Sequence, residues 1–312
     1  MVGVYAGQTS IYMVSLEDAN LEWADSTTVS GADQNRQSRI TNALREMVED
    51  AECGGEPAWM SASGASEVVR VVEFPDMEED EMEGAVQFEA EEMVSRDISE
   101  MDVDYALVEK TEDGAMRVLV AASPRKLNDT KMALLNEAGL RCQGITTAVA
   151  ALTTAFQRAG QPDSQGSALL RLGEKHCNMV LLNDKKPRIV RMIHNGAPGA
   201  GDDEAGEEDD REEGIGADRL ERCIARLRTS IERSIEHEAR KVPGVRDYTL
   251  YLCGESSTIS GVKEGLADSL GCPVRYFDPF RGLELSCSVP GAPGERSCFA
   301  LACGAALMGE AE

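Results

Sequence analysis

The 312-residue chain is poor in aromatic side chains, which make up 4% of it, and has 56 Asp and Glu against only 31 Lys and Arg. Its core must therefore be built from Val, Leu, Ile, Met and Ala. The formal net charge of −25 argues against nucleic-acid binding, because phosphate binding requires clustered cations. Anionic lipid surfaces are repelled for the same reason, so work at a membrane would need a protein partner. The negative charge would attract a partner with a basic segment and speed its association.

Metal-ligand spacing and long apolar runs are also absent. The nine Cys are scattered without a CxxC pair, and the three His lie far apart. This pattern favours reduced, buried thiols in a cytosolic protein over disulfides or a zinc site. Cys298 and Cys303 flank a helix start, where the pKa of a thiol can fall, but packing is the favoured interpretation of both. No stretch approaches the roughly 20 apolar residues of a membrane span, and no signal peptide opens the chain.

Strand and helix patterns alternate along the chain, which is typical of an α/β protein, and the length predicts two lobes. The first lobe is expected over 1–160 and the second over 161–312, with a Gly- and Pro-containing linker at 160–166 between them. The expected strands cover 2–6, 11–16, 21–28, 58–63, 67–74, 103–109, 116–121, 142–146, 168–172, 178–182, 188–193, 248–253 and 273–277, and the expected helices 36–51, 76–94, 124–138, 148–159, 218–241, 260–270 and 299–308.

One segment has strongly biased composition. Residues 197–214 are of low complexity, with nine acids and one Arg between 202 and 213. Like charges at this density resist packing, so we expect a disordered surface loop, with a docking tail for a basic partner as the alternative. The helix predicted at 218–241 carries one apolar stripe, which is more often part of a core than a seam for a partner.

Several strings resemble the PilM family of type IV pilus assembly and competence proteins. They lie in the family's order and span almost the whole chain. The resemblance implies an actin-like (ASKHA) two-lobed fold, with the inserted subdomain of FtsA-type and PilM-type proteins at about 75–145. The strings that carry it are Phe74-Pro75-Asp76-Met77, Val86-Gln87-Phe88-Glu89-Ala90-Glu91, Val103-Asp104-Tyr105-Ala106-Leu107-Val108, Leu135-Asn136-Glu137-Ala138-Gly139-Leu140, Phe277-Asp278-Pro279-Phe280 and Ala300-Leu301-Ala302-Cys303-Gly304-Ala305-Ala306-Leu307.

The chain departs from the family at the nucleotide site. Two loops, one per lobe, form this site in actin-like folds, and each typically begins with an Asp that organises Mg²⁺. Tyr5 and Arg171 stand at those two positions, Tyr12 replaces a Lys, and Glu174 places negative charge where the γ-phosphate would lie. The adenosine motif, Cys253-Gly254-Glu255-Ser256, is half retained. The acidic run also replaces the interval of the family's 2B-equivalent subdomain, which is therefore expected to be reduced or missing.

These departures predict that the family's ATP and Mg²⁺ site is lost. We expect no cofactor, no metal and no catalytic residue, which makes the chain a pseudo-ATPase. The expected remnants of the nucleotide loops are Gly7, Gln8, Thr9, Ser10, Gly173 and Gly254.

By resemblance, the function is that of a non-catalytic cytoplasmic scaffold in a type IV pilus-like or type II secretion-like assembly, peripheral to the inner membrane. The implied partner is the N-terminal cytoplasmic tail of a PilN-like single-span membrane protein, bound between the first lobe and the inserted subdomain. No nucleic acid and no direct membrane insertion are expected, and a homo-oligomer remains open. Core packing is an equally open role for each candidate groove residue: Val71, Val72, Phe74, Tyr105, Leu107 and Val118.

The sequence leaves two alternative functions open. The first is an active actin-fold ATPase or kinase that binds Mg-ATP between the lobes through loops 5–10 and 171–177. The second is a filament-forming actin homologue, which normally couples to nucleotide and so meets the same difficulty. Fold by itself cannot separate these functions, because one scaffold hosts many of them.

Overall fold

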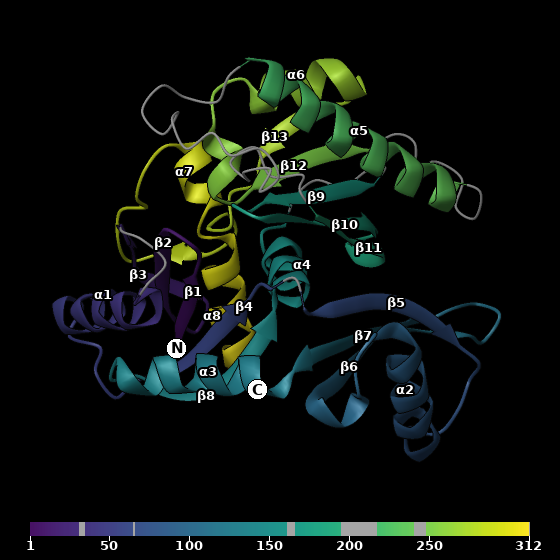
Figure 1. The fold of residues 1–312 in the computed structure, drawn as a ribbon, viewed down its shortest axis with the longest axis horizontal. Helices are drawn as coiled ribbons and strands as arrows, with labels where there is room; N and C mark the ends of the chain where they lie inside the picture. Colours follow the sequence, from purple (N-terminus) through teal and green to yellow (C-terminus); the bar gives the residue numbers. More distant parts are fainter. Residues whose placement is uncertain (31–34, 65, 161–165, 195–216, 240–247, 312) are drawn as a thin grey trace.

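A computed structural model describes residues 1–30, 35–64, 66–160, 166–194, 217–239 and 248–311. Within them, one sheet forms the centre of each lobe and a third, smaller sheet lies beside the first lobe (Figure 1). The expected acidic loop 197–214 and most of the linker lie outside the described residues. No helix that the structure describes is long and apolar enough to cross a membrane.

The first lobe is a six-stranded sheet with the order β14-β3-β2-β1-β4-β8. Period-two alternation along its strands gives the sheet two apolar faces: one packs against α1 and α3, the other against α4 and α8. The elements are β1 (Val2–Ala6), β2 (Ser10–Glu17), β3 (Asn20–Thr28), β4 (Pro57–Ala62), β8 (Arg141–Thr147), β14 (Glu284–Leu285), α1 (Arg36–Asp50), α3 (Arg125–Glu137), α4 (Ala148–Arg158) and α8 (Ala300–Ala311).

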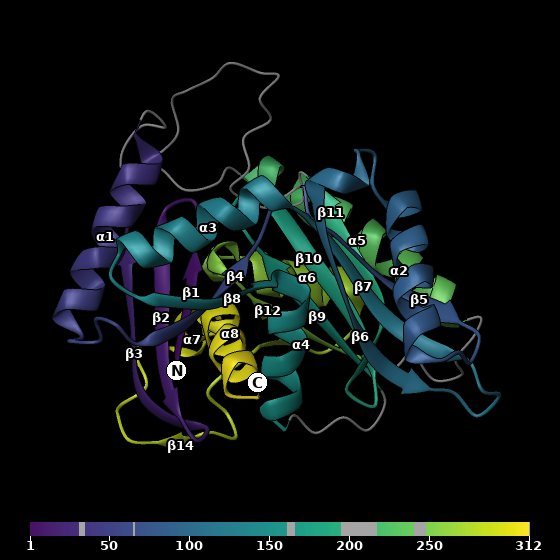
Figure 2. The same ribbon diagram turned by 90° about the horizontal axis from the view of Figure 1, so that it is seen from below.

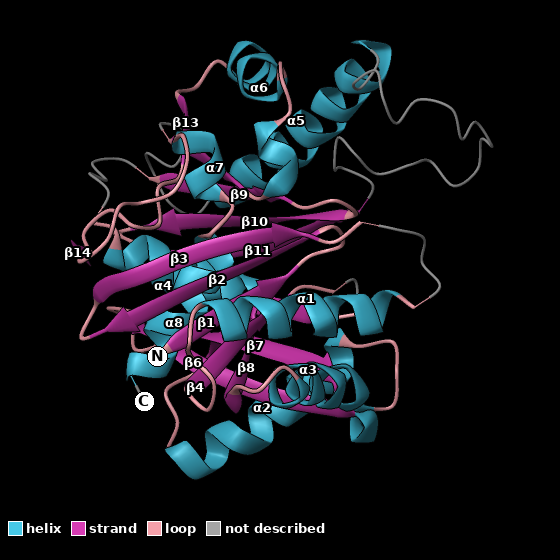
Figure 3. Ribbon diagram, turned by 90° about the vertical axis from the view of Figure 1, so that its left-hand side faces the viewer, coloured by secondary structure: helices cyan, strands magenta, loops and turns pink. Residues whose placement is uncertain are grey.

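The second lobe is a five-stranded sheet with the order β11-β10-β9-β12-β13. Helices α5 and α6 cover its outer face, and α4 packs against its inner face (Figure 3). The apolar stripe of α5, including Leu227 and Ile231, is buried in this core, as the sequence predicts. The elements are β9 (Ser167–Leu172), β10 (His176–Asn183), β11 (Lys186–His194), β12 (Thr249–Cys253), β13 (Val274–Tyr276), α5 (Ala217–Ala239) and α6 (Val262–Leu270).

The inserted subdomain, called the insert below, is a three-stranded sheet β5-β7-β6 with one helix, α2, on one face. Its strands are β5 (Val68–Phe74), β6 (Met101–Lys110) and β7 (Met116–Pro124), and α2 covers Glu79–Met93. The insert therefore occupies 68–124, whereas 75–145 was expected, because α3 and β8 pack in the first lobe. The helix expected to begin at Asp76 is capped at Glu78, whose N–H donates to Glu81 Oε2 at 3.2 Å.

The C-terminal part of the chain returns to the first lobe. Strand β14 pairs with β3, and α8 lies against β1 and beside α4 (Figure 2). Two glycines permit this close approach: a Cβ at Gly3 would lie 2.0 Å from the Ala302 carbonyl, and a Cβ at Gly304 would lie 2.0 Å from the Ala151 carbonyl. The stretch 161–312 thus supplies the second lobe and also a core helix of the first lobe. The short elements β14, α7 (Pro293–Ser297), η1 (Ile98–Glu100) and η2 (Glu255–Thr258) had no counterpart in the sequence prediction.

Candidate functional site

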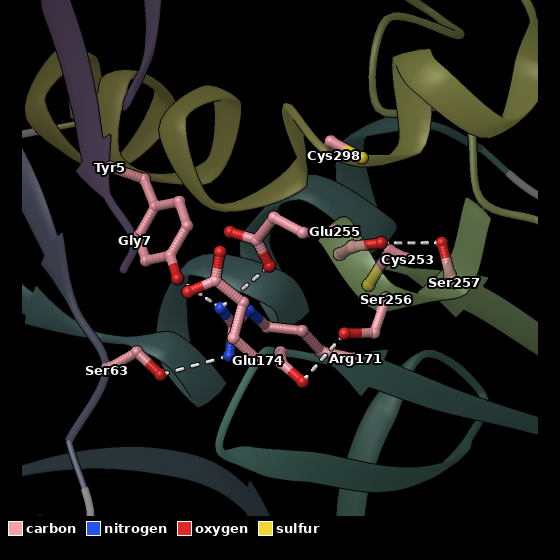
Figure 4. Close-up of polar contacts among 12 residues, drawn as sticks. Tyr5, Gly7, Ser63, Arg171, Glu174, Cys253, Glu255, Ser256, Ser257 and Cys298 are labelled. Atoms are coloured by element: carbon pink, nitrogen blue, oxygen red, sulfur yellow. Dashed lines mark hydrogen bonds and ion pairs between the residues drawn. The ribbon is translucent and has the colours of Figure 1, made fainter. Parts of the chain in front are cut away.

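A buried arginine links the two lobes at the expected nucleotide cleft. Arg171 lies one residue before the end of β9, is 3% exposed, and bonds to residues of both lobes (Figure 4). Its Nη2 donates to the Tyr5 hydroxyl in the first lobe and lies 3.3 Å from Glu255 Oε2 in the second. Its Nη1 donates to Ser63 Oγ at 3.1 Å, again in the first lobe. The guanidinium also lies over the Tyr5 ring, with Cζ 4.9 Å from the ring centroid.

A second interlobe contact joins the two loops themselves. Glu174 Oε1 accepts hydrogen bonds from the Thr9 backbone N–H at 3.1 Å and from the Thr9 hydroxyl. Ser63 Oγ lies 3.0 Å from His176 Nε2, which adds a further polar contact between the lobes. We call Tyr5, Thr9, Arg171, Glu174 and Glu255 the interlobe cluster. It brings together Tyr5, Arg171 and Glu174, where the sequence departs from the family, and Thr9, one of the expected remnants of the first loop.

The glycines of the expected nucleotide loops are closely packed by neighbouring groups. A Cβ at Gly7 would lie 2.9 Å from Glu255 Oε1, and a Cβ at Gly173 would lie 2.5 Å from Arg171 Nη1. Gly254 adopts a φ of +87°, and a Cβ there would lie 2.7 Å from the Leu172 carbonyl. The chain's own side chains therefore fill the space beside two of these glycines, and backbone closes on the third. Gln8 and Ser10 complete the first loop, where the Gly7 N–H donates to the Ser10 carbonyl at 2.8 Å.

Burial perturbs the ionisation of the interlobe cluster. Desolvation raises the pKa of the Tyr5 phenol well above its usual value, although the charge of Arg171 opposes the rise. Desolvation also raises the pKa of the Glu174 carboxyl, against the hydrogen bonds from Thr9, and the charge of Glu255 adds to the rise. One oxygen of each carboxylate, Glu174 Oε2 and Glu255 Oε1, is buried without a hydrogen-bond partner. Arg171 can therefore neutralise the carboxylate of Glu255, whereas the carboxylate of Glu174 depends on its hydrogen bonds from Thr9.

The thiols near the cleft behave as packing groups. Desolvation raises the pKa of Cys298 and of Cys303 to about 12, so neither is an activated thiolate. Over the described ranges, no group of three or more His, Cys, Asp or Glu side chains is placed to hold a metal ion.

A groove of about 370 Å³ lies where the insert meets the first lobe. We call it the insert groove. Its lining combines apolar walls with three carboxylates, and it receives residues from both the insert and the first-lobe sheet. The lining residues are Trp59, Ala62, Glu67, Asp102, Asp104, Tyr105, Ala106, Leu119, Ala121, Ser123, Asn128, Met132, Ile145, Thr146, Thr147, Ala150 and Met308.

Of the six groove residues proposed from sequence, Tyr105 lines the insert groove. Phe74 and Val118 are buried under α2, and Val72 packs into the same cluster. Val71 packs against the core that the two lobes share, and Leu107 is 51% exposed outside the groove. Strand alternation explains the difference: on β7 the residues facing the first lobe are Leu119, Ala121 and Ser123, one position removed from Val118.

An ion-pair network fixes the insert against the second lobe. Glu109 of β6 lies within salt-bridge distance of Arg117, Lys186 and Arg188, the last two on β11. Strand β5 also runs beside β11. Since the groove lies between the insert and the first lobe, these contacts hold one of its walls in place.

Comparisons with solved structures agree with this architecture. A protein from a "PilM-PilN type IV pilus biogenesis complex" superimposes with a TM-score of 0.81 at 22% identity, covering 99% of this chain and 98% of that chain. The ethanolamine utilization protein EutJ of Carboxydothermus hydrogenoformans gives 0.53 at 11% identity, covering 98% and 88%. A Bacteroides thetaiotaomicron protein described as having an actin-like ATPase fold gives 0.50 at 9% identity, covering 90% and 91%. These likenesses establish the actin-like fold.

A comparison with protein families shows which family the chain belongs to. No curated protein matches the chain at a significant level. The model of the family described as "Type IV pilus assembly protein PilM" matches residues 6–193, which is more than half of the chain. The sequence motifs, the two lobes and the insert all fit this match, and the chain belongs to the PilM family of type IV pilus assembly proteins.

Proposed function

We propose that this protein is a non-catalytic scaffold of a type IV pilus-like or related secretion assembly, located in the cytoplasm beneath the inner membrane. In this proposal it binds the N-terminal cytoplasmic tail of a PilN-like membrane protein in the insert groove. The observation that carries the proposal is the groove itself, an apolar-walled channel of about 370 Å³ between the insert and the first lobe. The structural relative in complex with PilN supports the choice of partner.

The interlobe cluster supports the non-catalytic part of the proposal. Mg-ATP needs carboxylates that organise the metal and an open cradle for the phosphates. The two positions where the family resemblance implies metal-organising acids hold a phenol and a guanidinium, and side chains of the cluster fill the space beside Gly7 and Gly173. The residues present therefore do not fit Mg-ATP.

The proposed tail binding is tested with synthetic peptides that copy the cytoplasmic N-terminus of the organism's own PilN-like protein. Isothermal titration calorimetry on the full chain should give a saturable signal that a scrambled peptide lacks. Ala106→Trp should obstruct the groove and weaken binding at least about tenfold, or about 1.4 kcal/mol. Leu107→Trp changes the neighbouring exposed residue outside the groove and should leave binding intact. Absence of binding to wild-type protein, or equal loss in both variants, would contradict the proposal.

The second candidate, an active ATPase or kinase, rests on the actin-like fold alone. It predicts stabilisation by Mg-ATP, since a ligand at 100 times its Kd adds about 2.7 kcal/mol to the free energy of unfolding. We expect thermal denaturation to be unchanged by millimolar Mg-ATP. A clear shift would favour the enzyme.

A further inference from the structure

The charged residues that line the insert groove are all acidic. Three of its lining residues are acids, Glu67, Asp102 and Asp104, and none is Lys, Arg or His. Asp102 already has partners within the chain: Arg125 Nε at 3.0 Å and Asn128 Nδ2 at 2.8 Å. Its charge is therefore largely satisfied, which leaves Asp104 near the surface and Glu67 deeper in the wall as the carboxylates open to a partner.

Glu67 has an unusual environment for a carboxylate. It lies in the short connection between β4 and β5 and is only 5% exposed. Oε2 accepts one hydrogen bond, from the Gly64 N–H at 3.3 Å, and Oε1 is buried without any hydrogen-bond partner. A carboxylate buried with so few donors destabilises the fold. A donor that the chain does not supply would remove this penalty.

The surrounding charges do not satisfy Glu67. Lys131 of α3 and Arg171 of β9 favour its ionised form electrostatically, but desolvation outweighs them and raises the pKa of the carboxyl to about 7. Arg171 is committed to the interlobe cluster. Arg70 and Arg191 do not line the insert groove; they line a second cavity of about 270 Å³ that Glu67 also borders.

We propose that Glu67 accepts hydrogen bonds from a Lys or Arg side chain of the apolar segment that binds in the insert groove. Asp104 attracts the same cation at the surface. This inference rests on the proposed function and specifies the chemistry of the partner: an apolar segment with a basic residue. An ionised donor forms the stronger hydrogen bond to a carboxylate and also neutralises a buried charge, which a neutral donor cannot do. The cytoplasmic flank of a single-span protein is rich in such residues.

The test is a double-mutant cycle between the groove and the tail. Calorimetry compares the wild-type tail with tails in which each Lys or Arg in turn is replaced by norleucine, on wild-type protein and on Glu67→Gln. One replacement should weaken binding to wild-type protein at least about tenfold, and Glu67→Gln should weaken the wild-type tail by a similar factor. Combining the two changes should add little further loss, because both remove the same interaction.

The matched control is Asp102→Asn, which removes one charge from the same groove but from a carboxylate that the chain already satisfies. It should change affinity less than about threefold. Glu67→Gln keeps the side-chain volume, and its thermal denaturation shows whether the fold is intact before binding is measured.

A second readout is the pH dependence of binding. If the bound cation requires ionised Glu67, affinity for wild-type protein should rise about tenfold from pH 6 to pH 8, and this rise should be absent in Glu67→Gln. Tail binding that is unaffected by Glu67→Gln, or losses that add fully in the cycle, would overturn this inference and leave the proposed function standing. A wild-type tail that does not bind would overturn both.

Discussion

The buried carboxyl of Glu67 makes the stability of the protein itself sensitive to pH. Its folded-state pKa is raised from 4.5 to about 7, so the folded protein binds more protons than the unfolded chain between these values. The contribution of this group to the free energy of unfolding is therefore fully present below pH 4.5 and is lost as pH rises through 7. From these two pKa values, the loss between pH 5 and pH 8 is about 2–3 kcal/mol.

The perturbation that isolates this effect is Glu67→Gln, which cannot ionise and keeps a carbonyl oxygen for the Gly64 N–H. Urea denaturation of both proteins at pH 5 and pH 8 gives the difference in free energy of unfolding at each pH. Relative to wild type, the variant should be about 2–3 kcal/mol more stable at pH 8 than it is at pH 5. The reasoning is refuted if the variant and the wild type differ in free energy of unfolding by the same amount at both pH values, because Glu67 would then ionise normally in the folded state.

Three further predictions concern the interlobe cluster, the helix contacts and the thiols. Arg171→Ala should destabilise the fold by about 3–5 kcal/mol, because it leaves Glu255 buried without a cation, whereas Lys110→Ala, which breaks an exposed pair with Asp76, should cost less than about 1 kcal/mol in the same urea titration. Gly304→Ala should destabilise by at least about 1–3 kcal/mol because its Cβ would meet the Ala151 carbonyl; Gly84→Ala, on the open face of α2, should instead stabilise by up to about 1 kcal/mol, and equal effects would contradict the packing described. With a thiol reagent under native conditions, the partly exposed Cys142, Cys272 and Cys287 should react before the buried Cys253 and Cys303, and a fast reaction at Cys253 would be inconsistent with its burial.

The sequence predicted the regular elements well because their patterns are local. The apolar stripe of α5 and the short apolar runs of β1 and β2 each follow from a few turns or residues of sequence, and all appear as expected. The short elements β14 and α7 were missed because a two-residue strand exists only through its pairing with β3, and a five-residue helix has too few residues for a periodic pattern.

The site was predicted unevenly for a physical reason. Tyr5 and Arg171 stood out because they occupy positions where acids were expected, but their contact depends on how the lobes close, which no local pattern contains. The groove residues required knowledge of which strand face meets the first lobe, and a one-residue shift inverts that face. Glu67 was not singled out. The signal available was an acid directly before an apolar strand, which becomes informative only once its burial is known.

The interlobe cluster has a consequence for how the protein responds to its surroundings. In a hinged pair of lobes closed by a diffusible solute, the degree of closure follows the concentration of that solute. Here the groups that join the lobes, Arg171 and Glu174, belong to the polypeptide, so their effective concentration is set by the fold and not by the metabolite pool. If the protein binds no nucleotide, as we propose, the shape offered to a partner should be the same in a starved cell as in a growing one, and any regulation should come from the partner or from the surface.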